Sequence, residues 1–580
     1  METFQSLLGR RLSDALAKAG LPDAGELTLA TDARFGDYQT NAALILGKQR
    51  GEKPRDVAET ILAHLDVSDL AEKPTVAGAG FINFTMRPEA VAERAAEILA
   101  DDRLGVARST CPKKIVIDFG SPNVAKPMHV GHIRSTVLGD SLARIATFLG
   151  HDVVRDNHVG DWGTQFGMVI WGWKNLLDRE SLARDPIAEL VRIYKETNER
   201  SKTDPAVREA ARQELVKLQA GDTENVSIWK QSVDLSMQEF ERAYQVLDIH
   251  YDIQRGESFY NDRLPDVVER LLKSGIAEIS EGAVVVFFRD IPELADKPAI
   301  IRKKDGGFNY ATTDLATVDY RANDLKADTI WYVVGAPQIL HFKEVFEIAR
   351  RAGYAADFRH ITFGSILGEN RKLMKTRSGE NVPLRDLLDE AVQRARTIVE
   401  EKNPDLSEAD KIDIAQKIGI GAVKYYDLSQ YRMTDYVFSW DRMLSLQGNT
   451  APYLQNAYVR IRSIFRKADV ATPLWEVGSE TGHRPVATKL ILKEPAEINL
   501  AKRLTQFAEI VPQVLNDFRP NMLANYLFEL ANSFHAFYEA CPVLKSEEPT
   551  RSSRLALCEL TGRVLQRGLD LLGIKVPEKM

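Results

Sequence analysis

The amino-acid sequence predicts a multidomain α/β plus α protein. It comprises a parallel-sheet α/β domain with an insertion, an N-terminal α+β domain and a C-terminal all-α helical-bundle domain. Three observations lead to this fold class. A strand, a helix and a second strand follow one another between residues 113 and 154, the same alternation returns between residues 330 and 363, and the pattern from about residue 390 is almost wholly helical. The length of 580 residues fits about four domains at roughly 150 residues each.

Residues 1–110 predict the N-terminal α+β domain. The first helix ends near Gly20 and has one apolar face, formed by Phe4, Leu7, Leu8, Leu12 and Leu16. A second helix follows Arg55, and a third is expected from about residue 88 to residue 100. Short strands are expected at residues 75–77 and 81–84, and the polar stretch 101–112 is typical of a linker.

Residues 111–390 predict the parallel-sheet domain. The β-branched run Lys113–Phe119 lies between polar residues, as a buried strand does, and the turn-rich segment Gly120–Asn123 follows it. Val153 begins a second extended segment after a helix that Gly150 closes. The apolar face of that helix is Ile133, Val137, Leu138, Leu142, Ile145 and Leu149. A strand, helix and strand in so short a span form the βαβ unit of a parallel sheet.

Long charged helices interrupt this rhythm from about residue 185 to residue 290, and we interpret residues 185–290 as an insertion within the parallel-sheet domain. The α/β pattern then returns, with an expected strand at 330–334, a helix at 340–352 and a strand at 360–363. Residues 391–580 predict the helical-bundle domain.

Composition and charge exclude several classes of protein. Hydrophobic residues at 44% and charged residues at 27% are ordinary globular usage. The net charge of −7 argues against non-specific coating of DNA or of a membrane, although a local basic groove remains compatible with it. No apolar stretch approaches the ~18 residues of a membrane span. Arg10 and Arg11 interrupt the first apolar pattern, which argues against a signal peptide, so we expect a cytoplasmic protein.

The three cysteines are too scattered for a disulfide framework or a four-thiolate zinc site. They are Cys111, Cys541 and Cys558. We therefore expect free thiols in a reducing compartment and no metal held by the protein itself.

The densest polar cluster, Asp118–His132, lies where a predicted parallel strand ends and a helix begins. Ligands of open α/β sheets bind at such edges, and the free N–H groups of a helix start favour phosphate. His129 and His132 are three residues apart and share a face of the helix start, and Gly131 lets a nucleotide approach the backbone. Two alternatives remain open at this point, a zinc pair and two solvated histidines that cap the helix.

A second cluster, Arg371–Gly379, follows the predicted strand near Phe363 in the second α/β half. It gathers basic and hydroxylated residues, and two glycines, Gly368 and Gly379, flank it. A mobile basic loop of this kind can close over a polyphosphate and stabilise its developing charge. The alternative is a generic basic surface loop.

The two clusters together resemble a known family. His129-Val130-Gly131-His132 resembles the His-x-Gly-His signature of class I aminoacyl-tRNA synthetases, and Met374–Ser378 lies where that class carries its Lys-Met-Ser-Lys-Ser loop. Further segments resemble the arginyl-tRNA synthetase family specifically, and they are Ser121–His132, Tyr310–Ala316, Gly448–Tyr458, Phe35–Asn41 and the terminal Met580. The resemblance implies a Rossmann-type catalytic domain, an N-terminal domain that binds the D-loop at the tRNA elbow, and an anticodon-binding helical domain.

The activity that this resemblance implies is that of an ATP-dependent, AMP-forming arginine–tRNA ligase. L-arginine and ATP would give arginyl-adenylate and pyrophosphate, with Mg²⁺ bridging the phosphates, and arginine would pass to the 3′-terminal adenosine of tRNA(Arg). Activation would depend on bound tRNA. The implied catalytic residues are Lys126, His129, His132, Lys375 and Arg377, and the ATP-binding set also includes Gly131, Thr376 and Ser378. Arg377 stands where other class I enzymes have a second lysine, and either Lys126 or Arg377 would replace that lysine.

The resemblance also implies two further sets of binding residues. The arginine-binding set is Asp118, Asn123, Glu257, Tyr310, Asp314 and Gln338. Tyr310 and Asp314 are i, i+4 and would share a helix face, where a carboxylate can read the planar guanidinium by two hydrogen bonds. The tRNA-binding set is Phe35, Gln39, Trp440, Arg442, Tyr453, Tyr458, Arg460, Arg462, Tyr526 and Met580. The basic residues and tyrosines from Arg442 onward suit phosphate contact and base stacking.

We expect the protein to act as a monomer on tRNA, L-arginine and ATP, with neither DNA nor a membrane as a partner. Two alternatives compete with this interpretation: a nucleotidyltransferase that makes a small molecule, and an inactive paralogue that only binds tRNA. The sequence predicts no specific role for the insertion.

Overall fold

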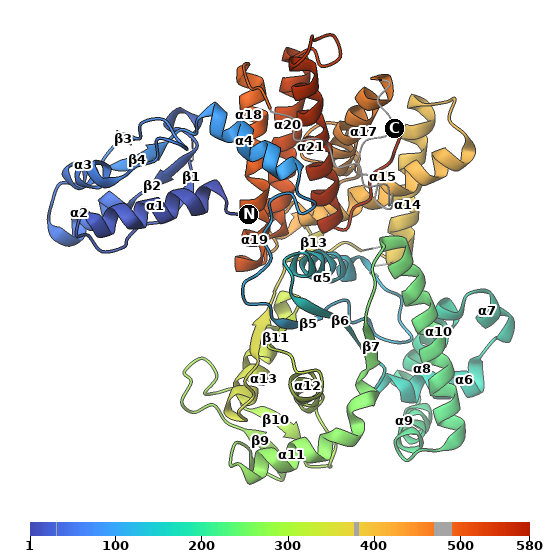
Figure 1. Cartoon of the computed structure of the whole chain (residues 1–580). Helices are drawn as coiled ribbons and strands as arrows, with labels where there is room; N and C mark the ends of the chain where they lie inside the picture. Colours follow the sequence, from blue (N-terminus) through green and yellow to red (C-terminus); the bar gives the residue numbers. More distant parts are fainter. Residues whose placement is uncertain (31, 376–381, 469–489) are drawn as a thin grey trace. The chain divides into compact units, whose positions relative to one another are not determined.

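The structure is a computed structural model of the chain, and it describes all residues except 31, 376–381 and 469–489. The chain divides into two compact units. Unit 1 comprises Met1–Arg108, Ser445–Asp570 and Lys575–Met580, and unit 2 comprises Ser109–Leu444 and Leu571–Ile574. Figure 1 labels most of the helices and strands of both units.

The N-terminal part of unit 1 is an α+β domain, as the sequence predicts. Its antiparallel sheet has the strand order β1-β2-β4-β3, with bounds β1 (Leu27–Leu29), β2 (Tyr38–Thr40), β3 (Thr75–Ala77) and β4 (Phe81–Phe84). Its helices are α1 (Phe4–Lys18), α2 (Ala42–Arg50), α3 (Pro54–His64) and α4 (Pro88–Leu99). The strands β3 and β4 have the predicted bounds. The sequence does not predict β1 and β2, because three-residue strands are too short for apolar alternation to stand out, or α2, whose residues show little amphipathic pattern.

The C-terminal part of unit 1 is helical, which confirms the predicted fold class. Its helices are α17 (Ala451–Lys467), α18 (Pro495–Thr505), α19 (Phe507–Asp517), α20 (Pro520–Ala540) and α21 (Thr550–Leu571). Polar contacts join this part to the N-terminal sheet within the unit. Lys502 Nζ lies 2.7 Å from Asp37 Oδ2, and the Tyr38 hydroxyl lies 3.0 Å from Glu509 Oε1.

Unit 2 is built on a five-stranded parallel sheet in the order β12-β11-β5-β6-β7. The strands are β5 (Lys114–Asp118), β6 (Asp152–Val159), β7 (Ile253–Gly256), β11 (Thr329–Tyr332) and β12 (Asp357–His360). In chain order this is the 3-2-1-4-5 arrangement of a Rossmann-type sheet, so the predicted Rossmann-type fold is confirmed. The strand predicted at 360–363 ends at His360, three residues early, where the chain leaves the pairing with β11.

Helices cover both faces of this sheet (Figure 1). They include α5 (Val130–Phe148) on one face, and α12 (Tyr310–Asp319) and α13 (Ile339–Arg351) on the other. Gly139 lets α5 approach the sheet closely, since a Cβ there would lie 2.3 Å from the Phe119 ring. On the opposite face, Val116 shares a buried cluster with Leu315 and Val345. β5 is thereby packed on both faces of the sheet.

The connections between the strands hold most of the additional structure. Between β6 and β7 lie α6 (Gln165–Leu176), α7 (Arg179–Arg184), α8 (Pro186–Thr203), α9 (Pro205–Gln219) and α10 (Thr223–Leu247). Between β7 and β11 lie α11 (Leu264–Lys273) and a three-stranded antiparallel sheet of β8 (Glu278–Ser280), β9 (Ala283–Val286) and β10 (Ala299–Arg302). The segment 185–290 therefore includes β7, which belongs to the main sheet. Its four residues carry too weak a pattern to mark it as a strand.

Two long helices and a small sheet complete unit 2. The elements are α14 (Leu384–Lys402), α15 (Glu408–Leu428), the paired strands β13 (Ile366–Leu367) and β14 (Tyr436–Val437), and α16 (Trp440–Met443). Within the part of the chain that the structure describes, no helix is long and apolar enough to cross a membrane.

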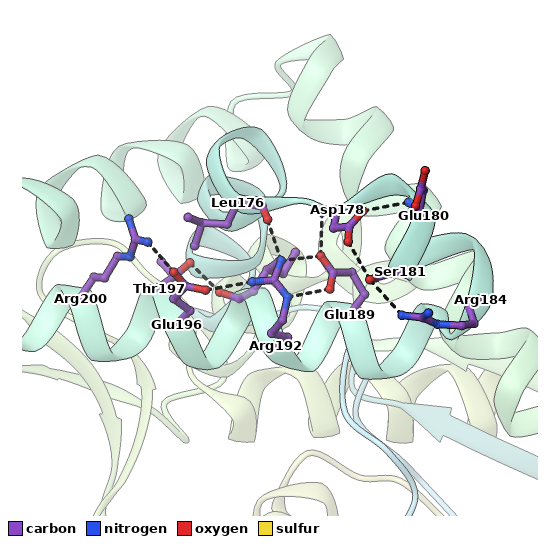
Figure 2. A network of polar contacts seen from close by, with 11 residues as sticks. Leu176, Asp178, Glu180, Ser181, Arg184, Glu189, Arg192, Glu196, Thr197 and Arg200 are labelled. Atoms are coloured by element: carbon purple, nitrogen blue, oxygen red, sulfur yellow. Dashed lines mark hydrogen bonds and ion pairs between the residues drawn. The ribbon is translucent and has the colours of Figure 1, made fainter.

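A network of polar contacts holds α6, α7 and α8 together (Figure 2). Glu189 lies at its centre. Its carboxylate accepts hydrogen bonds from Arg192 Nε and Nη2 at 2.7 and 2.6 Å, and from the Asp178 N–H at 2.8 Å. Arg192 also donates to the Leu176 carbonyl at 2.6 Å, so one ion pair connects three helix ends. These bonds lower the pKa of Glu189, the hydrogen bonds from Arg192 being the largest cause.

We expect Glu189→Ala to loosen this helical segment. The change leaves several donors without their buried acceptor, which should cost about 1–2 kcal/mol of local stability. Amides of α7 and α8 should then exchange with deuterium roughly five- to thirtyfold faster. Glu199→Ala is the matched control on the same helix, because its pair with Lys202 is 67% and 59% exposed and contributes little. Equal exchange rates in the two variants would contradict the role of Glu189.

Candidate functional site

The candidate site lies where the order of the main sheet reverses. The neighbouring parallel strands β5 and β11 end together, with Asp118 beside Tyr332. From there the chain continues into α5 on one face and toward α13 on the other (Figure 1). Such a reversal point opens a crevice at the carboxyl ends of the strands, which is the usual ligand position in these sheets. The segments after the two strands, 119–129 and 333–338, therefore border the site.

The loop after β5 has a constrained backbone. Gly120 and Ser121 have φ values of +88° and +47°. A side chain at Gly120 would clash, because a Cβ there would lie 2.4 Å from the Tyr251 hydroxyl. Ser135 Oγ accepts from the Gly120 N–H at 2.9 Å and donates to the Val333 carbonyl at 2.7 Å. This hydroxyl thus holds the segments after β5 and β11 in a fixed relation.

His129 and His132 cap the first turn of α5 reciprocally. His129 Nδ1 accepts from the Gly131 N–H at 3.1 Å, and His132 Nδ1 accepts from the His129 N–H at 3.0 Å. The ring centroids are 4.0 Å apart. His132 Nδ1 also lies 3.3 Å from the His129 carbonyl oxygen, but the contact with the His129 N–H is shorter. We therefore assign the proton of each neutral ring to Nε2. Capping therefore uses Nδ1 of each ring, and the Nε2–H of each ring remains available to donate a hydrogen bond to a ligand.

Burial keeps both rings neutral at physiological pH. It lowers the pKa of His132 to about 4, with a smaller contribution from His129, and it also lowers the pKa of His129. Two neutral donors at a helix start can hydrogen-bond phosphate oxygens without carrying a charge of their own. A zinc pair is not supported, because no group of three or more metal-ligating side chains occurs among the described residues.

Hydrogen bonds hold the chain on both sides of the basic signature loop, and one of them joins it to α5. The Gly368 N–H donates to the Lys372 carbonyl at 2.8 Å and closes a hairpin on one side. On the other side, the Val130 N–H donates to the Val382 carbonyl at 2.9 Å. Lys375 is exposed at the end of the hairpin, and Lys126 is exposed in the loop before α5. Thr376, Arg377 and Ser378 lie outside the described residues.

Asp118 sits at the carboxyl end of β5 in a buried ionic cluster. Ser121 Oγ donates to its Oδ1 at 2.9 Å, and Arg321 Nη2 lies 2.7 Å from its Oδ2. The same arginine lies 2.8 Å from Asp156 Oδ2 and has 0% exposure. Sequence reasoning missed Arg321, which lies in a π-helical turn, Tyr320–Asp324, after α12. No local sequence pattern predicts such a turn.

Asn123 is exposed in the same loop, next to Gly160. A Cβ at Gly160 would lie 2.3 Å from Asn123 Oδ1, so only glycine leaves room for this amide. Gln338 is also exposed, at the end of the short 3₁₀ turn Ala336–Gln338 that leads into α13. These two amides lie in the segments that follow β5 and β11.

Tyr310 and Asp314 occupy one face of α12, as predicted from their spacing. Asp314 Oδ2 lies 2.5 Å from His341 Nε2, and the Tyr310 ring centroid is 4.8 Å from that of His341. Glu257 begins the 3₁₀ turn Glu257–Arg263 after β7. Burial, together with the negative charges of Asp314 and Asp161, raises the pKa of Glu257 to about 7. Two acidic groups and an aromatic wall suit a planar cation.

The predicted RNA-contacting residues of unit 1 differ in accessibility. Phe35 is 44% exposed. Gln39 lines a cavity of about 520 Å³ together with Phe81. Arg460 and Met580 line a cavity of about 840 Å³ whose other lining residues include Arg466, Lys467, Lys545 and Lys579. The Tyr453 hydroxyl donates to Asn532 Oδ1 at 2.7 Å.

Other predicted contacts of unit 1 are buried. Tyr458 is 1% exposed within the helical part, and the Tyr526 hydroxyl donates to the Arg503 carbonyl at 2.9 Å. Arg462 is buried and lies 2.9 Å from Glu578. Burial disfavours direct RNA contact by these three side chains, whose role in tRNA binding stays a prediction.

In unit 2, Trp440 begins α16 and its side chain lies between Phe438 and Arg394. The ring centroids of Phe438 and Trp440 are 4.8 Å apart, and the Arg394 guanidinium lies 5.1 Å from the Trp440 ring. Arg442 is exposed two residues later. Their proposed RNA contacts stay predictions.

Comparisons with known proteins agree along the whole chain. Residues 94–440 match the family described as tRNA synthetases class I (R), catalytic domain, and residues 6–86 match the arginyl tRNA synthetase N terminal domain. Residues 454–580 match the DALR anticodon binding domain. An arginine–tRNA ligase of Synechococcus elongatus is 47% identical over 96% of this chain and 95% of its own. The chain belongs to the arginyl-tRNA synthetase family.

Other members of the arginyl-tRNA synthetase family support this placement. The arginine–tRNA ligase of Chromobacterium violaceum is 45% identical, with both chains covered completely. Among solved structures, the arginyl-tRNA synthetases of Plasmodium falciparum and Thermus thermophilus superpose with TM-scores of 0.85 and 0.83. Their sequence identities are 28% and 27%, and each match covers 100% of both chains.

Proposed function

We propose that this chain is an ATP-dependent arginine–tRNA ligase that attaches L-arginine to tRNA(Arg). The observation that carries the proposal is the 47% identity, over almost the full length of both chains, to an arginine–tRNA ligase. The arginine carboxylate attacks the α-phosphorus of ATP, pyrophosphate leaves, and arginyl-adenylate forms. A hydroxyl of the 3′-terminal adenosine then attacks the carbonyl carbon, loses its proton, and AMP leaves.

Catalysis in this proposal consists of positioning and charge stabilisation, without a covalent enzyme intermediate. The Nε2–H groups of His129 and His132 donate to phosphate oxygens, and Gly131 leaves space for the nucleotide beside the start of α5. Lys126 and Lys375 offset the charge on the leaving pyrophosphate. Arg377, Thr376 and Ser378 complete the ATP set by family register. Lys126 and Arg377 are both candidates for the role of the second signature-loop lysine.

Mg²⁺ enters this proposal as part of the ATP substrate. The described residues contain no group of three or more side chains suited to hold a metal ion. Mg²⁺ commonly keeps several waters and binds substrate phosphates rather than a dedicated protein cage. The ion would add positive charge at the phosphates. The roles given to the histidines and lysines do not depend on its exact position.

Arginine recognition is assigned to two ends of one pocket. Tyr310, Asp314 and Glu257 face the guanidinium, which has five donors and needs acceptors in its plane. The α-amino and carboxylate end is assigned to Asp118, Asn123 and Gln338. Arg321 holds Asp118 in place through the 2.7 Å ion pair. A lysine side chain would present a point charge and could not form the same paired contacts.

The tRNA contacts are assigned to several parts of the chain. Residues 1–110 are proposed to bind the D-loop through Phe35 and Gln39, and residues 391–580 to bind the anticodon. The basic cavity beside Arg460 and Met580 supports the second assignment, because unpaired bases need phosphate contact and stacking surfaces.

Residues 111–390 are the proposed catalytic domain, with residues 185–290 as its connective insertion. We further propose a cytoplasmic monomer that has neither DNA nor a membrane as a partner.

Activation is expected to depend on tRNA. Purified protein should charge tRNA(Arg) with arginine, and it should exchange pyrophosphate into ATP in the presence of arginine only when that tRNA is added. Rapid exchange without tRNA would refute this dependence while leaving the ligase activity intact. Charging of no tRNA would refute the ligase itself. ATP turnover on another small molecule would then indicate a nucleotidyltransferase, and tRNA binding without turnover an inactive paralogue.

The KM for arginine is expected to rise as the pH falls from 8 to 6. Glu257, with a pKa of about 7 in the free pocket, must lose its proton to face the guanidinium. A single required deprotonation of this kind weakens apparent binding by roughly tenfold over that interval. Asp314 and Asp161 also act on this group, so Glu257→Gln serves as the control. Its KM should be higher at pH 8 and nearly independent of pH, and an unchanged slope would contradict the assignment.

A further inference from the structure

His341 lies next to the guanidinium pocket and has no role in the proposed reaction so far. It is in the first turn of α13, three residues after Gln338, in the segment that follows β11. Its side chain is 11% exposed, and that of Asp314 is 22% exposed. The pair therefore sits at the edge of the buried core, within reach of a ligand.

The hydrogen bond between the two side chains has a defined direction. His341 Nε2 and Asp314 Oδ2 are 2.5 Å apart. His341 Nδ1 is buried and has no hydrogen-bond partner among the described residues. The proton of the imidazole therefore belongs on Nε2, where it has an acceptor, and His341 donates to Asp314.

Aromatic contacts fix the orientation of the imidazole ring. The Tyr310 ring centroid lies 4.8 Å from it at an interplanar angle of 60°, and the Phe342 centroid lies 5.2 Å away at 61°. Tyr310 is itself 62% exposed and forms the outer wall. The other charged or titratable groups that influence this pair include Glu257 after β7, Glu344 on α13 and His360 on β12. Packing thus holds the donor in place before any substrate arrives.

Among the described residues, Asp314 pairs with His341, and no lysine or arginine pairs with it. The bond to Oδ2 stops the carboxylate from rotating about its last torsion. Oδ1 and the second lone pair of Oδ2 remain available as two acceptors in one plane. A guanidinium can meet both at once, whereas an ammonium cannot.

We propose that His341 is a positioning residue of the arginine pocket, which fixes the Asp314 carboxylate in the orientation that reads the guanidinium. This inference rests on the proposed arginine–tRNA ligase activity. His341 acts through Asp314 and touches no reacting atom. Its contribution is therefore expected in the affinity and selectivity for arginine and not in the handling of ATP.

Three substitutions of the full-length protein separate positioning from packing. His341→Ala removes the donor, His341→Asn moves an amide nitrogen to the Nδ1 position, and His341→Gln can place one near the Nε2 position. In aminoacylation of tRNA(Arg), the Ala and Asn variants should lose about ten- to a hundredfold in kcat/KM for arginine, mostly through KM, as expected for a lost bond to a charged group. The Gln variant should recover most of this loss, and the KM for ATP should change less than about twofold.

A double-mutant cycle with Asp314→Asn tests whether His341 acts through that carboxylate. In the Asp314→Asn background, His341→Ala should cost less than about threefold more, because coupled residues are not additive. Full additivity, equal losses for Gln and Ala, or a parallel rise in the KM for ATP would each overturn the proposal. Wild-type protein that charges no arginine would instead refute the proposed ligase, so the two failures are distinguishable.

Discussion

His132→Ala is expected to lower kcat for adenylate formation far more than it raises the KM for arginine. Its Nε2–H contact strengthens as charge develops on the phosphates, so it stabilises the transition state more than the ground state. Loss of one such donor should cost about 2–4 kcal/mol, by analogy with donors to an oxyanion, or roughly thirty- to a thousandfold in rate. Single-turnover kinetics with tRNA and saturating substrates measure this step directly.

Capping of α5 supplies the competing explanation for such a loss, and two further variants separate the effects. His132→Asn keeps an acceptor near the Nδ1 position, which bonds the His129 N–H at 3.0 Å, but removes the outer donor. His132→Gln keeps a donor near the Nε2 position instead. We expect Asn to be as slow as Ala and Gln to be faster than both. If Asn restored kcat and Gln did not, His132 would be a capping residue only.

Because burial keeps the pKa of His132 at about 4, its contribution should not change between pH 6 and pH 8. The ring is neutral throughout this range and acts as a hydrogen-bond donor, not as a cation. The rate ratio of wild type to His132→Gln therefore should stay constant over that interval. This flat ratio contrasts with the pH-dependent KM expected from Glu257.

Local patterns predicted the elements that depend on burial. The β-branched run before Asp118 and the apolar face of α5 lie within one βαβ unit, so the sequence pattern predicted the strand and the helix there. The short strands β1, β2 and β7 were not, because three or four residues carry no clear period. The sequence pattern also did not predict β8 and β9, inside the segment 185–290 that was interpreted as long helices, or β10, which follows that segment.

The candidate site was predicted where chemistry is local, and missed where it depends on contacts between distant segments. Tyr310 and Asp314 follow from i, i+4 spacing on one helix. His341 and Arg321 do not, because each meets its carboxylates only through the packing of the sheet and helices. Tyr458 is a case where the sequence pattern did not show burial. Its place among basic residues suggested stacking on RNA, but the helical period puts it on the inward face with Leu454 and Ile461.

The largest effect on arginine selectivity is expected from Asp314→Asn, which keeps the shape of the side chain and removes its charge. The loss of a charge-assisted, two-point contact in a pocket with little water should cost on the order of 3 kcal/mol, roughly a hundredfold or more in kcat/KM for arginine. His341 sharpens this expectation. Its Nε2 atom lies 2.5 Å from Oδ2 in the wild type, so the Asn oxygen should turn toward that donor.

The Asn amide nitrogen then faces the substrate and opposes the donors of the guanidinium. Citrulline, the neutral isostere, has a carbonyl at that position and can accept from the amide, so the variant should narrow the gap between arginine and citrulline even if both remain poor substrates. The comparison of kcat/KM for the two amino acids in tRNA charging measures this directly. The KM for ATP should barely move, because the phosphates are assigned to the residues around α5 and the signature loop. A raised KM for ATP with arginine preference intact would show that Tyr310 and Asp314 do not form the guanidinium pocket.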